Sequence, residues 1–133
     1  MIKKILIAIL FLAVMGGYAI YYLWNKPHKR VENMDAININ GETLSKEYNE
    51  NEKVADSMYL NKAIEISGIV GQIDKNLDGG TMIILQSADS LTGIQCSMRE
   101  KAISVNKGLK VVIRGLCSGN GITGVSLTDC VLK

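Results

Sequence analysis

Histidine and aromatic side chains are scarce in this sequence of 133 residues, and their scarcity excludes several kinds of site. His28 is the only histidine, and it lies far along the chain from the C-terminal half. A Ser-His-Asp or Cys-His catalytic arrangement is therefore not indicated, because each needs a histidine beside its nucleophile. The carboxylates of the C-terminal half fall on predicted turns and strand ends and form no acid and base pair. The sequence predicts neither an enzyme nor a cofactor.

Residues 62–133 contain no Phe, Tyr or Trp. Proteins that bind single-stranded nucleic acid use aromatic stacking platforms beside a basic groove. A basic groove is not indicated either, since residues 34–133 hold ten Lys or Arg and twelve Asp or Glu, a net charge of −2. The positive surplus belongs to residues 1–33, where five Lys or Arg and one Glu can favour anionic lipid headgroups. Nucleic-acid binding is therefore not the favoured function.

Charge is absent from a long N-terminal run, Ile5 to Trp24. As a helix, these twenty residues reach roughly 30 Å, the thickness of the hydrocarbon core of a bilayer. A cleaved signal peptide is the alternative, but its apolar core has only about 7 to 15 residues and precedes a small-x-small site. Here the run ends in Tyr21, Tyr22 and Trp24, whose rings suit the membrane interface. The sequence predicts a tail over 1–4, a membrane-spanning anchor over 5–24 and a juxtamembrane spacer over 25–42.

After the anchor, the pattern changes from extended to helical. Ile37 and Ile39 alternate with polar residues and predict a short extended piece that stops at Gly41. From Thr43 to Tyr59 the apolar residues recur near one helical face, and Thr43 can cap the helix. Because the opposite face is charged, this segment is predicted to be an amphipathic helix packed on the domain that follows.

The C-terminal half contains five segments typical of strands, at 62–75, 81–87, 93–98, 109–118 and 122–132. Gly68 and Gly71 can bend the long first strand, Gly119 to Gly121 are predicted to join the last two, and a short helical candidate at 99–106 follows the third. A long bent first strand that joins both halves of a curved sheet is typical of a five-stranded OB-fold barrel. The predicted fold is mainly β, with a domain over 43–133 whose barrel covers 62–133.

Several stretches together resemble those of a bacterial family. They are YYLWNKPH behind the anchor, YLNKAIEISGIV at the start of the barrel, GIQCSM in the third strand, and KVVIRGLCSG and LTDCVL near the end. This family comprises small membrane-anchored proteins classified as tRNA-anticodon-binding-like (tRNA_anti-like) OB-folds. The resemblance implies an OB-fold on a single-pass anchor, and it implies no activity and no functional residues.

Charge does not decide the orientation of the anchor, because basic residues flank both of its ends. Lys3 and Lys4 precede it, and Lys26, Lys29 and Arg30 follow it. A short N-terminal tail is easily retained in the cytoplasm, and the family resemblance points the same way. We therefore expect a single-pass protein of the cytoplasmic (inner) membrane with its C-terminal domain outside the cytoplasm, in the periplasm of a cell that has one.

Two motifs that suggest a bound cofactor or metal are incomplete. The pattern DxNxDG at 74–79 resembles the start of a calcium loop, but Leu85 stands where that loop needs a bidentate Glu. A polar hairpin turn is the better interpretation, and no metal site is predicted. The pattern GxGxxG at 119–124 matches the dinucleotide fingerprint, but strand-like residues follow it where a helix is required.

The three cysteines, Cys96, Cys117 and Cys130, are too widely spaced for a zinc site built from close Cys pairs. Cys96 alternates in phase with Ile94 and Met98, which favours buried thiols that act as small apolar side chains. A disulfide with one free thiol is the alternative, and the sequence does not choose the pair.

The favoured function is a non-enzymatic binding or assembly module that holds a protein, peptide or glycan partner near the membrane of the cell envelope. OB barrels bind ligands across strands 2 and 3 and in the 1–2 and 4–5 loops, where the predicted binding residues are Asp78, Gln86, Gln95, Ser97 and Asn120. The alternative is a single-stranded nucleic-acid binder. Without aromatic platforms it would depend on Lys62, Lys75, Arg99, Lys101, Lys107, Lys110 and Arg114.

Overall fold

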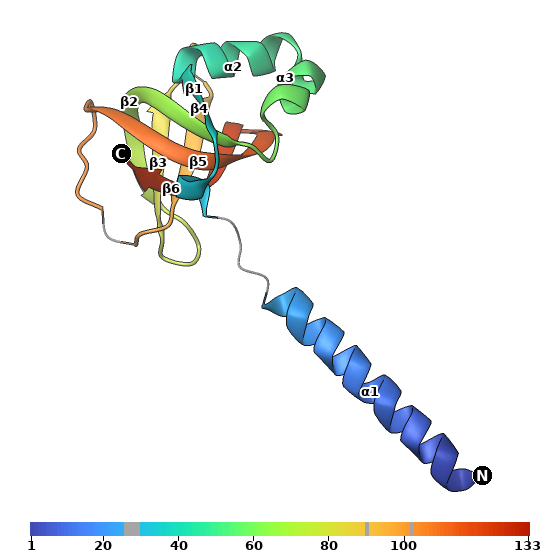
Figure 1. Cartoon of the computed structure of the whole chain (residues 1–133). Coiled ribbons are helices and arrows are strands. Elements are labelled where there is room, and N and C mark those ends of the chain that lie inside the picture. The colour runs from blue at the N-terminus through green and yellow to red at the C-terminus, as the bar shows by residue number, and fades with distance from the viewer. Residues whose placement is uncertain (26–29, 90, 102) are drawn as a thin grey trace.

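The computed structural model describes residues 1–25, 30–89, 91–101 and 103–133 (Figure 1). The basic residues Lys26 and Lys29, and the single histidine His28, lie outside these described residues. In chain order the elements are α1 (Ile2–Trp24), η1 (Val31–Asn33), β1 (Ala36–Asn40), α2 (Gly41–Glu50), α3 (Glu52–Tyr59), β2 (Ala63–Lys75), β3 (Thr81–Gln86), β4 (Gly93–Met98), β5 (Lys110–Gly121) and β6 (Gly124–Leu132).

The long strand β2 closes the barrel, because each of its halves has a different neighbour. The first half, Ala63 to Ile69, pairs antiparallel with β5, and the second half, Val70 to Lys75, pairs antiparallel with β3. The pairings β3–β4, β4–β6 and β5–β6 complete the ring, with β4 and β6 parallel. The predicted five-stranded OB-fold barrel is confirmed, and its strands are β2 to β6.

β2 bends where its sequence supplies glycine. Its register against β3 shifts between Val70 and Gln72, which makes Gly71 the extra residue of a bulge. A Cβ added at Gly68 would lie 3.2 Å from Cδ1 of Leu85, so the missing side chain leaves room for a close approach. As predicted from these two glycines, one strand serves both halves of the curved sheet.

A sixth strand, β1, lies beside the barrel and runs parallel to the first half of β2. The predicted extended piece is therefore part of the sheet, and Ile37 and Ile39 pack against the core. Val31, in the η1 turn just before this strand, is almost fully buried. Part of the segment predicted as a spacer over 25–42 is thus folded onto the domain.

The segment predicted as one helix from Thr43 to Tyr59 forms two helices, so that prediction was wrong in detail. Asn40, rather than Thr43, caps α2 by accepting a hydrogen bond from the Glu42 N–H at 2.8 Å. Asn51 then ends α2 and caps α3 by accepting from the Val54 N–H at 3.2 Å. Asparagine favours cap positions because its side chain satisfies free backbone N–H groups at a helix start.

The two helices cover one end of the barrel (Figure 1), which confirms the predicted packing. Leu44 and Tyr48 of α2 are buried in the core. The Tyr48 hydroxyl lies 3.4 Å from the Cys117 sulfur, and burial together with this hydrogen bond raises the pKa of the hydroxyl. Tyr59 of α3 donates to the Glu47 carboxylate of α2 at 2.5 Å, and burial followed by this contact raises the pKa of Tyr59 to about 12.

The helix predicted over 99–106 is not found in the described residues of that segment, so this prediction was wrong. The Thr81 hydroxyl instead donates to the Lys101 carbonyl oxygen at 2.7 Å, and Ile103 and Val105 pack on the core. Such contacts outweigh the propensity of so short a segment, because helix nucleation is unfavourable without many residues to propagate it.

The last hairpin also turns later than predicted. β5 continues to Gly121, and the turn into β6 contains Ile122 and Thr123. Gly119, predicted to begin the turn, lies inside β5 at a bulge against β6 and has φ of 94°. The strand-like course of 119–124 provides no helix start for a pyrophosphate, as the sequence indicated.

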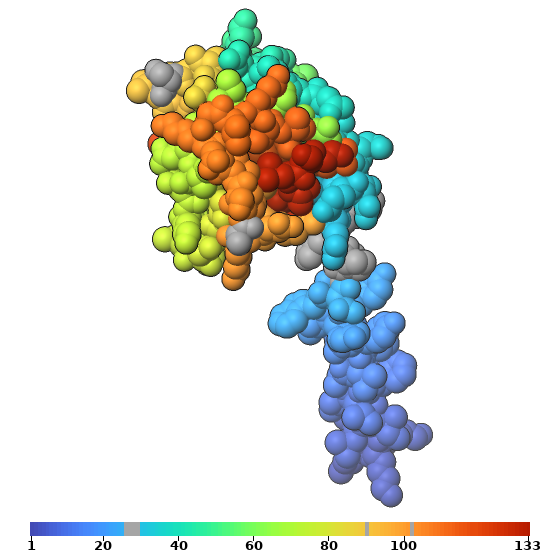
Figure 2. All heavy atoms as spheres, turned by 90° about the vertical axis from the view of Figure 1, so that its left-hand side faces the viewer, coloured from blue at the N-terminus to red at the C-terminus, as the bar shows by residue number. Residues whose placement is uncertain are grey.

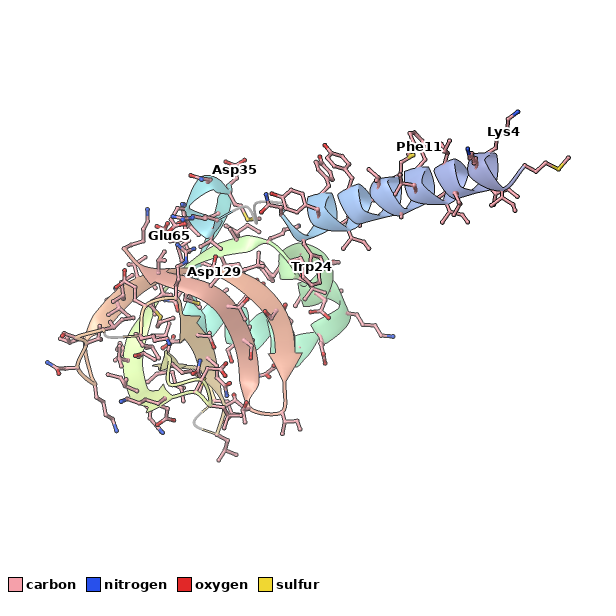
Figure 3. All side chains as sticks on the ribbon, turned by 90° about the horizontal axis from the view of Figure 1, so that it is seen from below. Lys4, Phe11, Trp24, Asp35, Glu65 and Asp129 are labelled. Carbon is pink, nitrogen blue, oxygen red and sulfur yellow. The ribbon has the colours of Figure 1, made fainter. Side chains whose placement is uncertain are left out.

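The helix α1 is long and apolar enough to cross a membrane. None of its residues is buried as it projects from the domain (Figure 2), and its side chains, Phe11 among them, extend on all sides (Figure 3). A helix that is apolar all round suits a lipid environment. The predicted anchor therefore has the length and apolarity that spanning requires.

Replacing Gly124 tests how tightly the last hairpin packs on β4. Gly124 has φ of 115°, and a Cβ there would clash with the carbonyl oxygen of Gly93. Gly124→Ala should lower the free energy of unfolding by about 3 kcal/mol or more, through overpacking and backbone strain. The measurement is thermal and denaturant unfolding of the full chain in detergent, followed by circular dichroism.

Gly79→Ala is the matched control for this experiment. Gly79 also has a positive φ, 75°, but nothing lies within 4 Å of a Cβ added there. This variant should lose only the roughly 1–2 kcal/mol of a left-handed conformation. Equal losses in the two variants would contradict the close packing of Gly124 on Gly93.

Candidate functional site

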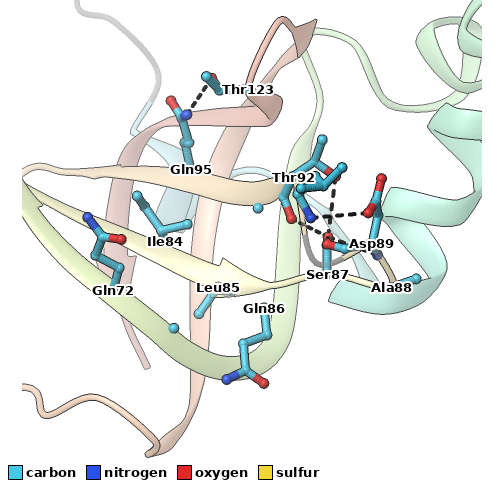
Figure 4. A pocket seen from close by; sticks show the side chains of 13 residues that line it. Gln72, Ile84, Leu85, Gln86, Ser87, Ala88, Asp89, Thr92, Gln95 and Thr123 are labelled. Atoms are coloured by element: carbon cyan, nitrogen blue, oxygen red, sulfur yellow. Dashed lines mark hydrogen bonds between the residues drawn. The ribbon is translucent and has the colours of Figure 1, made fainter.

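A polar hollow of about 610 Å³ lies on the outer face of the barrel, over β2, β3 and β4 (Figure 4). Its size falls within the roughly 300–1,000 Å³ of small-ligand sites. Because β3 and β4 are the second and third strands of the barrel, this is the face on which OB-folds bind ligands. The described residues that line the hollow are Gly71, Gln72, Ile84, Leu85, Gln86, Ser87, Ala88, Asp89, Leu91, Thr92, Gly93, Gln95 and Thr123.

The floor of the hollow is a row of three paired side chains. Gln72 of β2 is paired with Ile84 of β3, which is paired in turn with Gln95 of β4. Gln86 follows on the same face of β3, opposite Gly93. A Cβ at Gly93 would clash with the Ile84 side chain, so glycine is needed beside the floor. The floor therefore presents amide groups around one aliphatic side chain (Figure 4).

The loop from β3 to β4 forms one side of the hollow. Hydrogen bonds from side chains within the loop stabilise its conformation. The Ser87 hydroxyl lies within hydrogen-bonding distance of the carbonyl oxygens of Asp89 and Thr92. The Asp89 carboxylate accepts from the Leu91 N–H at 3.1 Å, an Asx turn within the loop. Asp89 itself lines the hollow, and its second carboxylate oxygen has no hydrogen-bond partner among the described residues.

The turn from β5 to β6 forms the opposite side. Gln95 Nε2 donates to the Thr123 hydroxyl at 2.5 Å, and the Gly93 N–H donates to the Thr123 carbonyl oxygen at 3.3 Å. These two bonds join the last hairpin to the start of β4. Two loops that are far apart in sequence are thereby held at one end of the same hollow.

The chemistry of the lining is polar and almost uncharged. Glutamine and the hydroxyl residues can both donate and accept hydrogen bonds. The Gln86 side chain is exposed and has no hydrogen-bond partner among the described residues. Asp89 is the one ionisable side chain among the described lining residues. The hollow is thus suited to a neutral partner rich in hydrogen-bonding groups.

Two of the five predicted site residues, Gln86 and Gln95, line this hollow. Ser97 lies on the same outer face, two residues further along β4, opposite Met82. Asp78 belongs to the β2–β3 turn, and Asn120 lies in β5, so neither lines the hollow.

Sequence reasoning missed Gln72, Ser87, Thr92 and Thr123. Gln72 was detectable in principle, but a strict alternation from Val70 would turn it toward the core, and only the bulge at Gly71 faces it outward. Thr123 was assigned to the last strand, and no local signal shows that a β5–β6 turn meets β4.

The calcium-like motif is a hairpin turn, as the sequence indicated. The Asn76 side chain accepts from the Gly80 N–H at 2.7 Å, and the Gly79 N–H donates to the Asn76 carbonyl oxygen at 3.0 Å. No group of three or more His, Cys, Asp or Glu among the described residues could hold a metal ion.

All three cysteines are buried and free, which agrees with their predicted role as small apolar side chains. A hydrogen bond with Cys96, followed by burial, raises the pKa of the Cys130 thiol far above its ordinary value. A protonated, inaccessible thiol is a poor nucleophile.

At the other end of β4, Arg99 joins the N-terminal side of the chain to the barrel. Its Nε and Nη2 atoms donate to the two carboxylate oxygens of Asp129, each at 2.7 Å, and Nη1 donates to Glu32 at 2.5 Å. We call these three residues the Arg99 clamp. Asp129 has φ of 53° and lies between two irregularities of strand pairing, which aim its carboxylate at Arg99.

A second set of ion pairs supports the clamp. Arg114 lies 3.2 Å from Glu65 and also donates to the Glu32 carbonyl oxygen at 3.1 Å. Lys133 lies 3.7 Å from Glu65. Glu32 of the η1 turn is therefore held twice, by Arg99 at its carboxylate and by Arg114 at its carbonyl oxygen.

The fold and the hollow together define the class of this protein: an OB-fold domain carried on an N-terminal apolar helix. The chain belongs to the tRNA_anti-like family, whose profile matches residues 1–131. The predicted family resemblance is thereby confirmed. None of the curated proteins matches the sequence at a significant level.

Among solved structures, the chain is similar to a Leishmania major Friedlin protein described as an aspartyl-tRNA synthetase. The sequence identity is 10% and the TM-score is 0.48. The similarity covers 81% of this chain and 22% of the other, so this chain spans about a fifth of the length of that protein.

The Arg99 clamp makes stability depend on pH. Hydrogen bonds from Arg99 hold the pKa values of Glu32 and Asp129 below their ordinary values. Because both pKa values are lower in the folded than in the unfolded chain, the clamp contributes fully above the ordinary carboxyl pKa of about 4 and is lost as pH falls below it. The difference in thermal midpoint between the native chain and Arg99→Gln should therefore shrink as pH falls from about 6 to about 3.

Lys46→Gln is the control, because Lys46 forms an exposed pair with Glu50 at 3.7 Å and lies away from the clamp. Its thermal midpoint should follow that of the native chain across the whole pH range. A constant gap between Arg99→Gln and the native chain would show that the two carboxylates are not linked to stability through Arg99.

Proposed function

We propose that this protein is a non-enzymatic, membrane-tethered binding module that holds an uncharged polar partner in the β3–β4 hollow. The partner would be a protein or peptide segment, or a glycan, of the cell envelope. The lining of the hollow is the observation that carries this proposal. Three glutamines and three hydroxyl side chains lie around the aliphatic side chain of Ile84, and Asp89 is the one ionisable group among the described lining residues. Such a surface satisfies neutral donors and acceptors and offers little to a polyanion.

The same lining supports binding rather than catalysis. The Ser87 hydroxyl is directed at carbonyl oxygens of its own loop. No His, Lys or Cys stands among the described lining residues to activate it as a nucleophile. Asp89 likewise has no second carboxylate beside it in the described lining for acid and base chemistry.

Single-stranded nucleic-acid binding is the alternative function, and the OB-fold and the family favour it. Two of the seven candidate cations, Arg99 and Arg114, form ion pairs with carboxylates. No Lys or Arg is among the described residues of the hollow. Since phosphate contacts supply most of the affinity for nucleic acid, the hollow is a poor candidate for it.

The proposal includes a location. We infer that α1 spans the cytoplasmic membrane and that the barrel stands outside the cytoplasm, in the periplasm where there is one. The length and apolar surface of α1 support the span. Protease added to intact spheroplasts should then degrade the barrel, whereas complete protection would contradict this location.

The experiment for the proposed function uses the full, isotope-labelled chain in lipid nanodiscs. Chitotetraose, a neutral peptide of Asn, Ser and Leu residues, and a single-stranded oligonucleotide are titrated separately by NMR. A neutral probe should shift resonances of the hollow. Gln86→Ala and Gln95→Ala should each weaken its binding about five- to tenfold, the value of one hydrogen bond of roughly 1 kcal/mol.

Asn38→Ala is the control variant, because Asn38 is an exposed amide on β1 and does not line the hollow. It should leave the affinity unchanged. The oligonucleotide should bind no tighter than about 10⁻⁴ M at physiological salt, the weak end of non-specific association. Failure of both neutral probes, or micromolar and salt-resistant oligonucleotide binding, would overturn the proposal.

A further inference from the structure

Two large aliphatic side chains are exposed on the two loops that flank the hollow. Leu91, on the β3–β4 loop, is 90% exposed, and Ile122, on the β5–β6 turn, is 102% exposed. A soluble domain places side chains of this size in full contact with water at a cost, and grouped exposed apolar residues mark interaction sites. Leu91 also lines the hollow itself.

The two loops that carry these side chains are joined to each other. The Gly93 N–H donates to the Thr123 carbonyl oxygen, and Gly124 packs so closely on Gly93 that a Cβ would clash. Leu91 lies two residues before Gly93, and Ile122 lies one residue before Thr123. Each of the two residues therefore stands two positions along the chain from the contact between Gly93 and Gly124.

Beside this apolar pair lie groups that recognise amides. Gln86 has no hydrogen-bond partner among the described residues, and its amide can pair with a backbone N–H and C=O. One oxygen of Asp89 accepts from the loop, which leaves the other for a donor on the partner. An extended peptide combines a regular series of amides with side chains on alternate sides, and it matches this arrangement.

The other two ligand classes match it less well. A glycan would use the amides but would leave Leu91 and Ile122 without an apolar partner. A nucleic acid would need cations or aromatic rings, which the described lining lacks.

We propose that the hollow binds an extended peptide segment of a partner protein, with one apolar side chain of that segment held between Leu91 and Ile122. The inference rests on the proposed function and narrows it to a polypeptide partner. The Gln86 amide contacts the peptide backbone, because Gln72 and Gln95 already donate to Asp74 and Thr123, and the Asp89 carboxylate faces a donor beside the apolar residue.

The test is a selection from a phage library of random peptides of about twelve residues, long enough to cross the hollow. The full chain in nanodiscs is the target, and the enriched peptides are synthesised and titrated. They should share an apolar residue. Leu91→Ser combined with Ile122→Ser should weaken their binding at least about tenfold, as expected for an apolar anchor at the centre of an interface.

Leu77→Ser is the matched control. Leu77 is 107% exposed on the β2–β3 turn and does not line the hollow, so its replacement should change the affinity by less than about twofold. Leu91→Met combined with Ile122→Leu keeps both side chains apolar and should retain binding. Thermal unfolding of every variant checks that the fold is unchanged.

The outcomes separate this inference from the proposed function. If no peptide is enriched, or if enriched peptides bind the Leu91→Ser and Ile122→Ser double variant as tightly as the native chain, the peptide inference is overturned. Chitotetraose binding that depends on Gln86 would in that case still support the proposed function and would assign the hollow to a glycan. If neither peptides nor chitotetraose bind, both the peptide inference and the proposed function are overturned.

Discussion

The domain depends on one strand, β2, which pairs with both β1 and β5 along its first half and with β3 along its second half. No other strand could close the ring, because β3 and β5 are not paired with each other. The bulge at Gly71 reverses the faces of the strand: Val70 faces the core opposite Leu85, and Gln72 faces outward opposite Ile84. The constraint that closes the barrel therefore also places the first glutamine of the hollow.

The η1 turn and the hollow lie at opposite ends of β4. Gly93 begins this strand beside the hollow, and Arg99 follows its last residue and holds Glu32 of the η1 turn. Six strand residues separate these ends by about 20 Å. A partner in the hollow would thus be held away from the point where the chain leaves for α1. Arg99 and Arg114, which as free cations could have served nucleic-acid binding, instead hold Glu32 of the η1 turn.

The sequence predicted those features that depend on local chemistry. The β-branched runs predicted the strands, Gly68 and Gly71 predicted the bend of β2, and the uncharged N-terminal run predicted the long apolar helix α1. The predicted helices were wrong where the contacts of a single residue interrupt an otherwise helical sequence pattern. Asn51 caps a new helix within an otherwise helical segment, and Thr81 and the core anchor the segment predicted as a helix over 99–106.

Only part of the candidate site could be predicted, because some of its residues are brought together by contacts between distant segments of the chain. Gln86 and Gln95 follow from strand alternation on the usual binding face of an OB-fold. Thr123 joins them through contacts between segments far apart in the sequence, and no local pattern reports such contacts. The Arg99 clamp was equally hidden, because Glu32 lies in a segment that composition alone describes as a spacer.

The central claim is that the hollow is the surface by which this domain meets its partner. Photo-crosslinking in living cells tests it most directly, with a benzophenone side chain placed at Gln86 of the full chain. The account predicts a reproducible adduct that is absent when the same group replaces Asn38 on β1 and absent from an anchor-only chain. No adduct at Gln86, or equal adducts at both positions, would contradict it.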